Sequence, residues 1–261
     1  MQARRAVELD LRKALPAGEF EVHYQPLINL EQDRVSGFEA LLRWSHPERG
    51  QVSPADFIPL AEEIGLINQI GAWVLRVACS DAASWPGDVR LAVNLSPVQF
   101  KSKTLVLDVI GALSHSGLPA DRLELEITET VMLQDTEATL NTLHQLKELG
   151  VRISMDDFGT GYSSLSYLRK FPFDKIKIDQ SFIRDLPGGQ DAVAIVKAVA
   201  GLGTSLGMST TAEGVETEGQ LARLRAEGCT EVQGWLFSPA RPASEVSELM
   251  STIYERFRAA A

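Results

Sequence analysis

The chain has 261 residues, of which 44% are hydrophobic and 23% charged, and its formal net charge is −10 at pH 7. This length suits two average domains or one large barrel, and the composition is typical of a soluble globular protein. The negative charge argues against binding to DNA or RNA, because proteins that bind a nucleic-acid backbone usually carry a basic stripe. It leaves open a small phosphate ligand held through metal ions.

Nothing in the sequence indicates membrane insertion, secretion or a disulfide framework. The apolar runs fall well short of the roughly 18 residues of a membrane-spanning helix, and the N-terminal residues lack the apolar region of a signal peptide. Cys79 and Cys229 lie far apart without C-x-x-C spacing, so we expect two reduced core cysteines. We predict a cytoplasmic domain without membrane contact, either alone or as the cytoplasmic output part of a larger, perhaps membrane-anchored, protein.

The first predicted elements are a helix and a pair of strands. Residues 1–18 carry Val7, Leu11 and Leu15 at helical spacing, and we expect a charged linker or lead-in helix with little of the domain to pack against. Strands are predicted at 19–30 and 35–44, with a short turn between them. Because a parallel crossover needs a dozen or more residues, this pair must run antiparallel.

Helix and strand signals then alternate to the C-terminal end. Ser53-Pro54 and Ser96-Pro97 each predict an N-cap followed by proline at the first helical position. Six further strands are predicted, at 91–94, 123–128, 151–156, 175–179, 208–213 and 230–233. Eight strands with helices between most of them predict one α/β domain at 19–261, a modified TIM-like (β/α)₈ barrel with one antiparallel strand near the N-terminus.

The predicted strands share one polar phase. In residues 123–128, for example, Leu123, Leu125 and Ile127 alternate with polar residues, and in a barrel covered by helices the polar phase points inward. Its last members stand at the C-terminal rim, where active sites of such barrels form. These members are Glu39, Asn94, Glu126, Asp156, Lys177, Asp179, Glu213 and Gln233. Such a polar ring, where Val, Ile and Leu usually pack, indicates a functional site.

A buried ion network around Lys177 and Arg43 is the structural alternative. The acids of the ring, with Asp157 and Glu216, outnumber these two cations, and unpaired carboxylates in a small cavity repel one another strongly. Divalent cations would remove that repulsion, and Asp157 could bridge to a second ion. Two such ions support in-line phosphoryl displacement. The hard oxygen ligands that suit Mg²⁺ or Mn²⁺ are those of Glu39, Asn94, Glu126 and Asp156.

These motifs resemble those of EAL domains, the bacterial phosphodiesterases of cyclic di-guanosine monophosphate (c-di-GMP). A single Glu-Ala-Leu tripeptide would carry no weight, but here an ordered set of motifs covers about residues 5–250. The set consists of Tyr24-Gln25-Pro26, Glu39-Ala40-Leu41-Leu42-Arg43-Trp44, Asn94-Leu95-Ser96, Glu126-Ile127-Thr128-Glu129, residues 156–165, Lys177-Ile178-Asp179, residues 212–216 and Gln233-Gly234.

The resemblance implies two metal sites in the rim. The first ion would be bound by Glu39, Asn94, Glu126 and Asp156. The second would be bound by Asp156, Asp157 and Glu213, the last directly or through water. Both ions would be Mg²⁺ or Mn²⁺.

The resemblance also implies roles for the residues around the metals. Lys177 would position the attacking water, with Asp179 and Gln233 completing its hydrogen-bond shell. The general base stays open between Glu213 and the metal-bound hydroxide. Substrate contacts are implied for Gln25, Leu42 and Arg43, support of the metal ligands for Glu216, and support of the loop after Asp157, through its amides or the hydroxyls of Thr160 and Ser163, for Glu129.

The implied reaction is metal-dependent hydrolysis of one phosphodiester bond of c-di-GMP to linear 5′-pGpG. The alternative is a catalytically silent module that binds c-di-GMP as a signal. Such a module would be expected to have lost metal ligands, and none is missing from this sequence. The resemblance further implies a homodimer and an upstream sensor or cyclase module in a longer protein.

Overall fold

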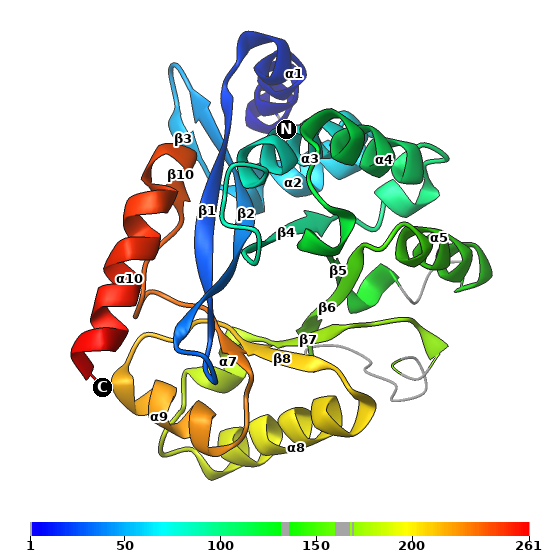
Figure 1. Cartoon of the computed structure of the whole chain (residues 1–261). Helices are drawn as coiled ribbons and strands as arrows, with labels where there is room; N and C mark the ends of the chain where they lie inside the picture. The colour runs from blue at the N-terminus through cyan, green and yellow to red at the C-terminus, as the bar shows by residue number, and fades with distance from the viewer. Residues whose placement is uncertain (1, 132–135, 160–167, 169, 261) are drawn as a thin grey trace.

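The computed structural model describes residues 2–131, 136–159, 168 and 170–260. Within them, eight strands form a closed ring with helices outside it (Figure 1). The predicted barrel is therefore confirmed. In chain order the ring strands are β1 (Phe20–Asn29), β2 (Arg34–His46), β4 (Arg90–Leu95), β5 (Leu123–Thr128), β6 (Arg152–Phe158), β7 (Lys175–Ile178), β8 (Ser209–Ala212) and β9 (Glu231–Val232).

The antiparallel strand of the ring is β1. It pairs antiparallel with β2 and with β9, whereas the neighbours from β2 round to β9 are parallel. The predicted hairpin is confirmed, and its register places Gln25 opposite Glu39. Two short strands that were not predicted, β3 (Gly50–Val52) and β10 (Arg241–Pro242), extend the sheet outside the ring.

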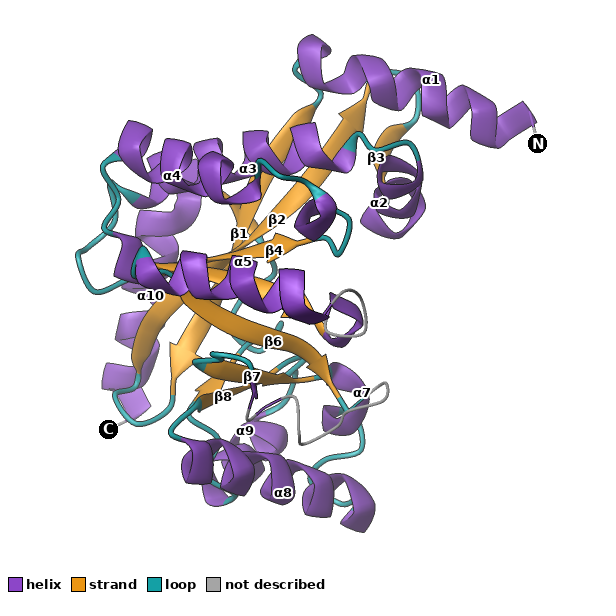
Figure 2. Ribbon diagram, turned by 90° about the vertical axis from the view of Figure 1, so that its right-hand side faces the viewer, coloured by secondary structure: helices purple, strands orange, loops and turns teal. Residues whose placement is uncertain are grey.

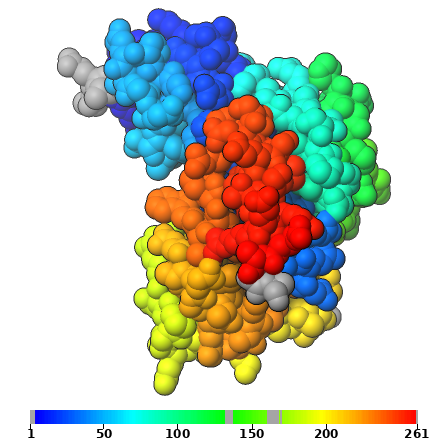
Figure 3. All heavy atoms as spheres, turned by 60° about the vertical axis from the view of Figure 1, so that its left-hand side comes forward, coloured from blue at the N-terminus to red at the C-terminus, as the bar shows by residue number. Residues whose placement is uncertain are grey.

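The helices cover the outer face of the ring (Figure 2). Their bounds are α1 Gln2–Ala17, α2 Pro54–Glu63, α3 Ile67–Ala82, α4 Leu105–Ser116, α5 Thr136–Glu148, α7 Gln180–Ile183, α8 Gln190–Leu206, α9 Glu218–Ala226 and α10 Val246–Ala260. Helix α10, whose residues are red in Figure 3, lies on the face of the molecule shown there and packs against β2. None of the described helices is both long and apolar enough to cross a bilayer.

The two Ser-Pro signals have different outcomes. Ser53 is the N-cap of α2 and Pro54 its first residue, as predicted. Ser96-Pro97 opens only a turn, followed by the 3₁₀ segment Gln99–Lys101, and the next helix starts at Leu105. The prediction of a helix at Pro97 is wrong because Ser96 closes a local turn instead, its Oγ accepting from Val98 N at 3.1 Å.

Helix α1 packs against the barrel more closely than expected. Leu11 and Ala14 are fully buried in the main core. On the polar side, Asp10 Oδ2 accepts from Arg49 Nη2 at 3.0 Å and lies 3.5 Å from His46 Nε2. The expectation that this helix has little to pack against is wrong, because two of its apolar side chains lie in the core. The division of the chain at residue 18 stays a prediction.

A buried ion layer fills the barrel below the rim. Lys175 Nζ lies 2.6 Å from Glu124 Oε1 and 2.6 Å from Glu231 Oε2, and Thr211 Oγ1 donates to Glu231 at 3.1 Å. The apolar phase of the same strands faces the helices, as Leu125 and Ile153 show by being fully buried in the main core. The inward direction of the polar phase, inferred from alternation, is confirmed in this layer.

Candidate active site

The rim residues converge on a single lysine. Lys177, from β7, is buried, and its Nζ lies 2.6 Å from Glu126 Oε2 of β5 and 2.6 Å from Glu213 Oε1, which follows β8. The same nitrogen is 3.3 Å from Asp156 Oδ1 of β6 and 3.6 Å from Glu39 Oε2 of β2. Four carboxylates from four strand ends thus surround one ammonium group. Arg43 forms no ion pair with these acids among the described residues.

Burial and charge displace the pKa values of this cluster in opposite directions. Burial alone would lower the pKa of Lys177, but Asp156, Glu126 and Glu213 raise it well above its usual value. Burial raises the pKa of Glu126 well above its usual value, although Lys177 opposes it. Burial would also raise the pKa of Glu39, but Lys177 and the hydrogen bond from Gln233 lower it. One ammonium cannot satisfy all four carboxylates, so the site retains an excess of negative charge.

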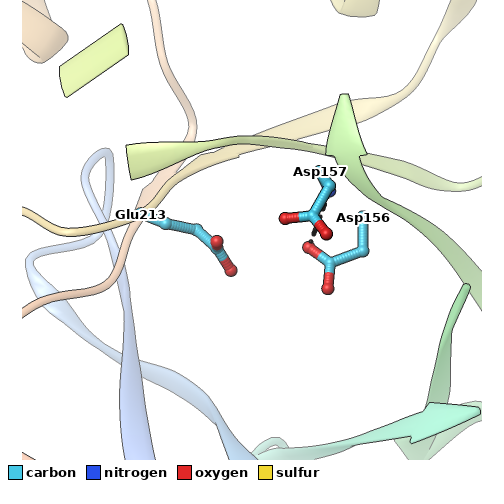
Figure 4. A group of neighbouring side chains, drawn as sticks. All are labelled: Asp156, Asp157 and Glu213. Atoms are coloured by element: carbon cyan, nitrogen blue, oxygen red, sulfur yellow. Dashed lines mark hydrogen bonds between the residues drawn. The ribbon is translucent and has the colours of Figure 1, made fainter. Parts of the chain in front are cut away.

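Asp156 and Asp157 both face the site although they are neighbours on one strand. Successive side chains of a regular strand point to opposite faces, but the pairing of β6 with β7 is irregular between Met155 and Phe158. Asp157 has a φ of 54°, a left-handed conformation that Asp tolerates better than most residues. Each carboxylate of Asp156, Asp157 and Glu213 places an oxygen within 4.8 Å of the others, and Asp157 N donates to Asp156 Oδ1 at 3.0 Å (Figure 4).

The donor set fits a hard divalent cation. All candidate ligand atoms are oxygens, the type that Mg²⁺ and Mn²⁺ prefer. Glu126 Oε1 is buried and has no hydrogen-bond partner among the described residues, a costly state that a cation would relieve. Asn94 Nδ2 donates to Glu39 Oε1 at 2.6 Å, and a half-turn of this amide would present its oxygen instead. These residues can therefore hold metal ions without rearrangement of the strands.

The raised pKa of Glu213 predicts a pH-dependent stability of the metal-free protein. Burial raises the pKa of Glu213 to about 7 against the opposing effect of Lys177. The folded state therefore binds this proton more tightly than the unfolded state. The resulting stabilisation is complete below the usual pKa of a Glu side chain and is lost as the pH rises through about 7. Since one pKa unit corresponds to about 1.4 kcal/mol, the free energy of unfolding should fall by up to about 3 kcal/mol.

This pH effect can be measured by urea unfolding in the presence of a chelator, between about pH 5 and pH 8. The matched variant is Glu213→Gln, which keeps the size of the side chain but cannot titrate. Its free energy of unfolding should depend less on pH than that of the wild type. Identical pH profiles for the two proteins would rule out Glu213 as the titrating group.

Glu129 contacts the loop that follows the two aspartates. Its side chain is buried and Oε1 accepts from Gly159 N at 2.9 Å, so one of the predicted amide contacts is present. Thr160 and Ser163, the hydroxyls named as further partners, lie outside the described residues. Gly159 has a φ of 95°, which favours glycine at this turn.

Two other predicted residues, Asp179 and Gln233, have contacts that differ from the expected ones. Asp179 caps α7, accepting from Ser181 N at 3.0 Å, and among the described residues it forms no ion pair with Lys177. Gln233 Nε2 donates to Glu39 Oε2 at 2.6 Å and to Gln25 Oε1 at 3.1 Å, so it holds Glu39 rather than Lys177. Strand-end position predicted their location, but alternation could not specify their partners.

Two pockets open at the rim and share Leu41. The first, of about 490 Å³, is lined by Glu39, Asp156, Glu213, Glu216 and Gln25, and also by Gln180, Arg184 and Trp235, which the sequence did not single out. Trp235 is 71% exposed, and its place after Gln233-Gly234 was the only sequence signal for it. The second pocket, of about 280 Å³, contains Leu42, Arg43 and Asn94.

Gly234 allows two loops at the rim to lie in direct backbone contact. A Cβ on Gly234 would lie 2.0 Å from Val215 O, so no other residue fits there without displacing backbone. Val215 N in turn donates to Gln233 O at 3.0 Å. The loop that carries Glu213 and Glu216 is thereby held against the loop that carries Gln233.

Comparisons with known proteins identify relatives over nearly the whole chain. An uncharacterized protein of Sinorhizobium fredii (strain NBRC 101917 / NGR234) is 54% identical over 97% of this chain and 30% of its own length. The bifunctional diguanylate cyclase/cyclic di-GMP phosphodiesterase MucR of Pseudomonas aeruginosa is 45% identical over 91% of this chain and 35% of its own length. The chain thus spans about a third of the length of these curated relatives.

The same likeness is found in solved structures and in a family model. A structure of the MucR phosphodiesterase in complex with c-di-GMP covers 91% of this chain and 98% of its own, with 45% identity and a TM-score of 0.87. The family model of the EAL domain matches residues 8–240, which include the strands of the ring and all the rim acids. The chain therefore belongs to the EAL domain family.

Proposed function

We propose that this domain hydrolyses one phosphodiester bond of c-di-GMP to linear 5′-pGpG, using two Mg²⁺ or Mn²⁺ ions bound at the rim. The observation that carries the proposal is the excess of carboxylates around the buried Lys177 beside two pockets that share Leu41. Relatives named as c-di-GMP phosphodiesterases, and a solved relative in complex with c-di-GMP, support the choice of substrate.

In this proposal the first ion would be held by Glu39, Asn94, Glu126 and Asp156, and the second by Asp156, Asp157 and Glu213, the last directly or through water. When bound, such ions make water more acidic, stabilise the charge that develops on the phosphoryl group and align the attacking and leaving oxygens. Glu216 lines the same pocket and supports these ligands. Arg43 offers its guanidinium group to a phosphate oxygen, with Leu42 and Gln25 as further substrate contacts.

Lys177 and Glu213 have different roles toward the attacking water: one donates a hydrogen bond to it and the other accepts its proton. The pKa of Lys177 is raised well above its usual value by the surrounding acids, so its amine stays protonated and serves as a donor that orients the attacking water. Glu213, whose Oε1 lies 2.6 Å from Lys177 Nζ, is placed to accept the proton of that water. The new bond forms between the water oxygen and phosphorus, the bond from phosphorus to O3′ breaks, and solvent protonates O3′. Gln233 positions Glu39, to which its amide donates, and Asp179 positions the start of α7, whose Gln180 lines the acidic pocket of about 490 Å³.

The decisive experiment is incubation of the purified domain with c-di-GMP and Mg²⁺ or Mn²⁺, followed by chromatographic separation of the nucleotides. Linear pGpG should accumulate, and a chelator should stop its formation. Either metal alone should also raise the melting temperature, since a ligand that binds only the folded state stabilises it. Binding of c-di-GMP without any product would contradict the proposal and would establish the silent binding module instead.

We also propose that the domain works within a longer protein. The relatives are about three times as long as this chain, and one of them is named for both cyclase and phosphodiesterase activities. An upstream sensor or cyclase module, a homodimer and a cytoplasmic location are therefore part of the proposal. Sedimentation of the purified domain tests the dimer directly, and a monomer at all concentrations would contradict it.

Loss of the Glu129 side chain should lower both the apparent Mg²⁺ affinity and turnover. Glu129→Ala removes the acceptor of Gly159 N and loosens the loop that starts at Asp157, a support whose loss typically lowers metal affinity about 10- to 100-fold. We expect a weaker apparent Mg²⁺ affinity and a lower kcat, with little change in the melting temperature without metal. The measurement is kcat against Mg²⁺ concentration, with Glu137→Ala, an exposed position on α5, as control. A Mg²⁺ curve superimposable on that of the wild type would leave Glu129 without a part in metal binding.

A further inference from the structure

Arg256 of α10 connects two segments at the rim of the barrel. The C-terminal end of α10 lies beside α9 (Figure 1), and Arg256 Nη2 donates to Glu218, the first residue of α9. Arg256 Nη1 donates to Leu236 O at 2.5 Å, and its guanidinium carbon lies 4.8 Å from the centre of the Phe237 ring. Glu218 follows the loop after β8, whereas Leu236 and Phe237 lie in the loop after β9.

The contacts of Arg256 with the loop after β9 are the stronger ones. The side chain of Glu218 is 71% exposed, so its ion pair contributes little. Leu236 O has no other hydrogen-bond donor among the described residues. The planar guanidinium can bond this carbonyl while it lies over the ring of Phe237. Arg256 therefore acts mainly on residues 234–237, which we call the rim turn.

The rim turn forms part of the wall of the acidic pocket. Gly234 and Trp235 line this pocket of about 490 Å³. Trp235 is 71% exposed and lies outside the main core, so the backbone of the turn, not packing, sets its place. Directly after the turn, Ser238 O accepts from Gln25 Nε2 at 3.3 Å, and Gln25 is a proposed substrate contact. A displacement of the rim turn would move both parts of the pocket wall.

The residues nearest the proposed metal site are anchored independently of the rim turn. Gln233 N donates to Ala212 O at 2.8 Å, and Glu213 N donates to Ile178 O at 3.1 Å. Backbone bonds to neighbouring strands thus fix both residues. Loss of the Arg256 contacts should therefore disturb the pocket wall and leave the carboxylates in place.

We propose that Arg256 is a positioning residue for the nucleotide, because it holds the rim turn so that Trp235 and Gln25 form one wall of the acidic pocket. The inference rests on the proposed function and extends it to α10. This helix lies outside residues 8–240, the part of the chain that the family model matches. A side chain without the planar fork of arginine cannot bond the carbonyl and lie flat on the ring at the same time.

The test is the kinetics of Arg256→Met, which keeps an unbranched side chain but removes the guanidinium. We expect KM for c-di-GMP to rise at least about fivefold, while kcat per folded molecule stays within about twofold of the wild type. A merely structural role would lower the folded fraction, and with it the apparent kcat, at an unchanged KM. The matched control is Arg258→Met, because the Arg258 guanidinium lies over Tyr254 of α10 itself, 6.0 Å from the ring centre.

Binding measured without turnover separates this inference from the proposed hydrolysis. In the Glu39→Ala background, calorimetry should show that Arg256→Met raises the Kd for c-di-GMP by the same factor as KM. An Arg256→Met protein with the KM and Kd of Arg258→Met would overturn the inference and leave the proposed hydrolysis in place. A lower kcat per folded molecule at an unchanged KM would also overturn it. A wild-type domain that neither binds nor hydrolyses c-di-GMP would overturn both.

Should Arg256→Met fail to fold, Phe237→Leu takes its place. This substitution removes the ring under the guanidinium and keeps an apolar side chain. Its KM for c-di-GMP should rise at least about threefold, because the guanidinium loses the surface that orients it toward Leu236 O. An unchanged KM in that folded variant would equally overturn the inference.

Discussion

Replacing Glu39 with alanine is expected to abolish turnover of c-di-GMP while the domain stays folded. Glu39 lies at the point where Asn94, Gln233 and Lys177 meet, and in the proposed mechanism it binds the first metal ion. A metal ion contributes several kcal/mol to stabilising the transition state. Since each 1.4 kcal/mol is a factor of ten in rate, the loss should be about a thousandfold or more.

The fold should survive because Glu39→Ala removes one of four acids that crowd Lys177. That relief offsets the two amide groups, of Asn94 and Gln233, that lose their acceptor. The measurement compares kcat, the melting temperature and c-di-GMP binding with those of Glu21→Ala, an exposed acid on β1. Turnover at the wild-type rate in limiting Mg²⁺ would show that Glu39 is not a metal ligand.

Replacing Lys175 with methionine is expected to destabilise the barrel by about 3–5 kcal/mol. Lys175 is 2% exposed and is the shared partner of Glu124 and Glu231. Burial would raise the pKa of Glu231, but Lys175 lowers it to about 2. Without the ammonium group, two buried carboxylates would face each other. Arg152, whose Nε lies 3.4 Å from Glu124 Oε2, and Arg90, whose Nη1 lies 3.9 Å from Glu231 Oε1, each contact one of them and would offset part of the loss.

Urea unfolding of Lys175→Met measures this loss, and a compensating variant isolates its cause. Adding Glu124→Gln and Glu231→Gln removes the stranded charges, so the triple variant should regain most of the lost stability. The contrary result, a triple variant no more stable than Lys175→Met, would show that packing around the lysine stem matters more than charge. Turnover per folded molecule should change less than stability, because this layer lies below the proposed metal ligands.

The sequence predicted the barrel because its physical signals are local. Alternation with a period of two is visible in the longer ring strands, such as residues 123–128, and the short turn at 31–33 permits only an antiparallel pair. The short strands β3 and β10 escaped prediction because two or three residues cannot show a period. The burial of Leu11 and Ala14 escaped it for another reason, since the surface that covers them comes from segments distant in the chain.

The sequence predicted which strand-end residues form the candidate site, but not which side chains they contact. The final polar residue of each strand located Glu39, Glu126, Asp156 and Glu213, and the structure brings all of them to Lys177. The alternation rule alone would direct Asp157 away from Asp156, and only the irregular pairing of β6 turns both inward. Gln180 and Trp235 were missed because they lie on α7 and in the segment after β9, where no strand phase marks them.

The reversed direction of β1 decides at which end of the barrel the chain enters. In a barrel made only of parallel strands, the first strand starts at the end opposite the active site. Here Phe20, the first residue of β1, pairs with Trp44 near the last residue of β2, so the chain enters at the end where the carboxylates lie. Helix α1 is fastened at that end through Asp10 and Arg49. A displacement of α1 is therefore transmitted to β2, the strand that carries Glu39, at the active-site end of the barrel and not through its full length.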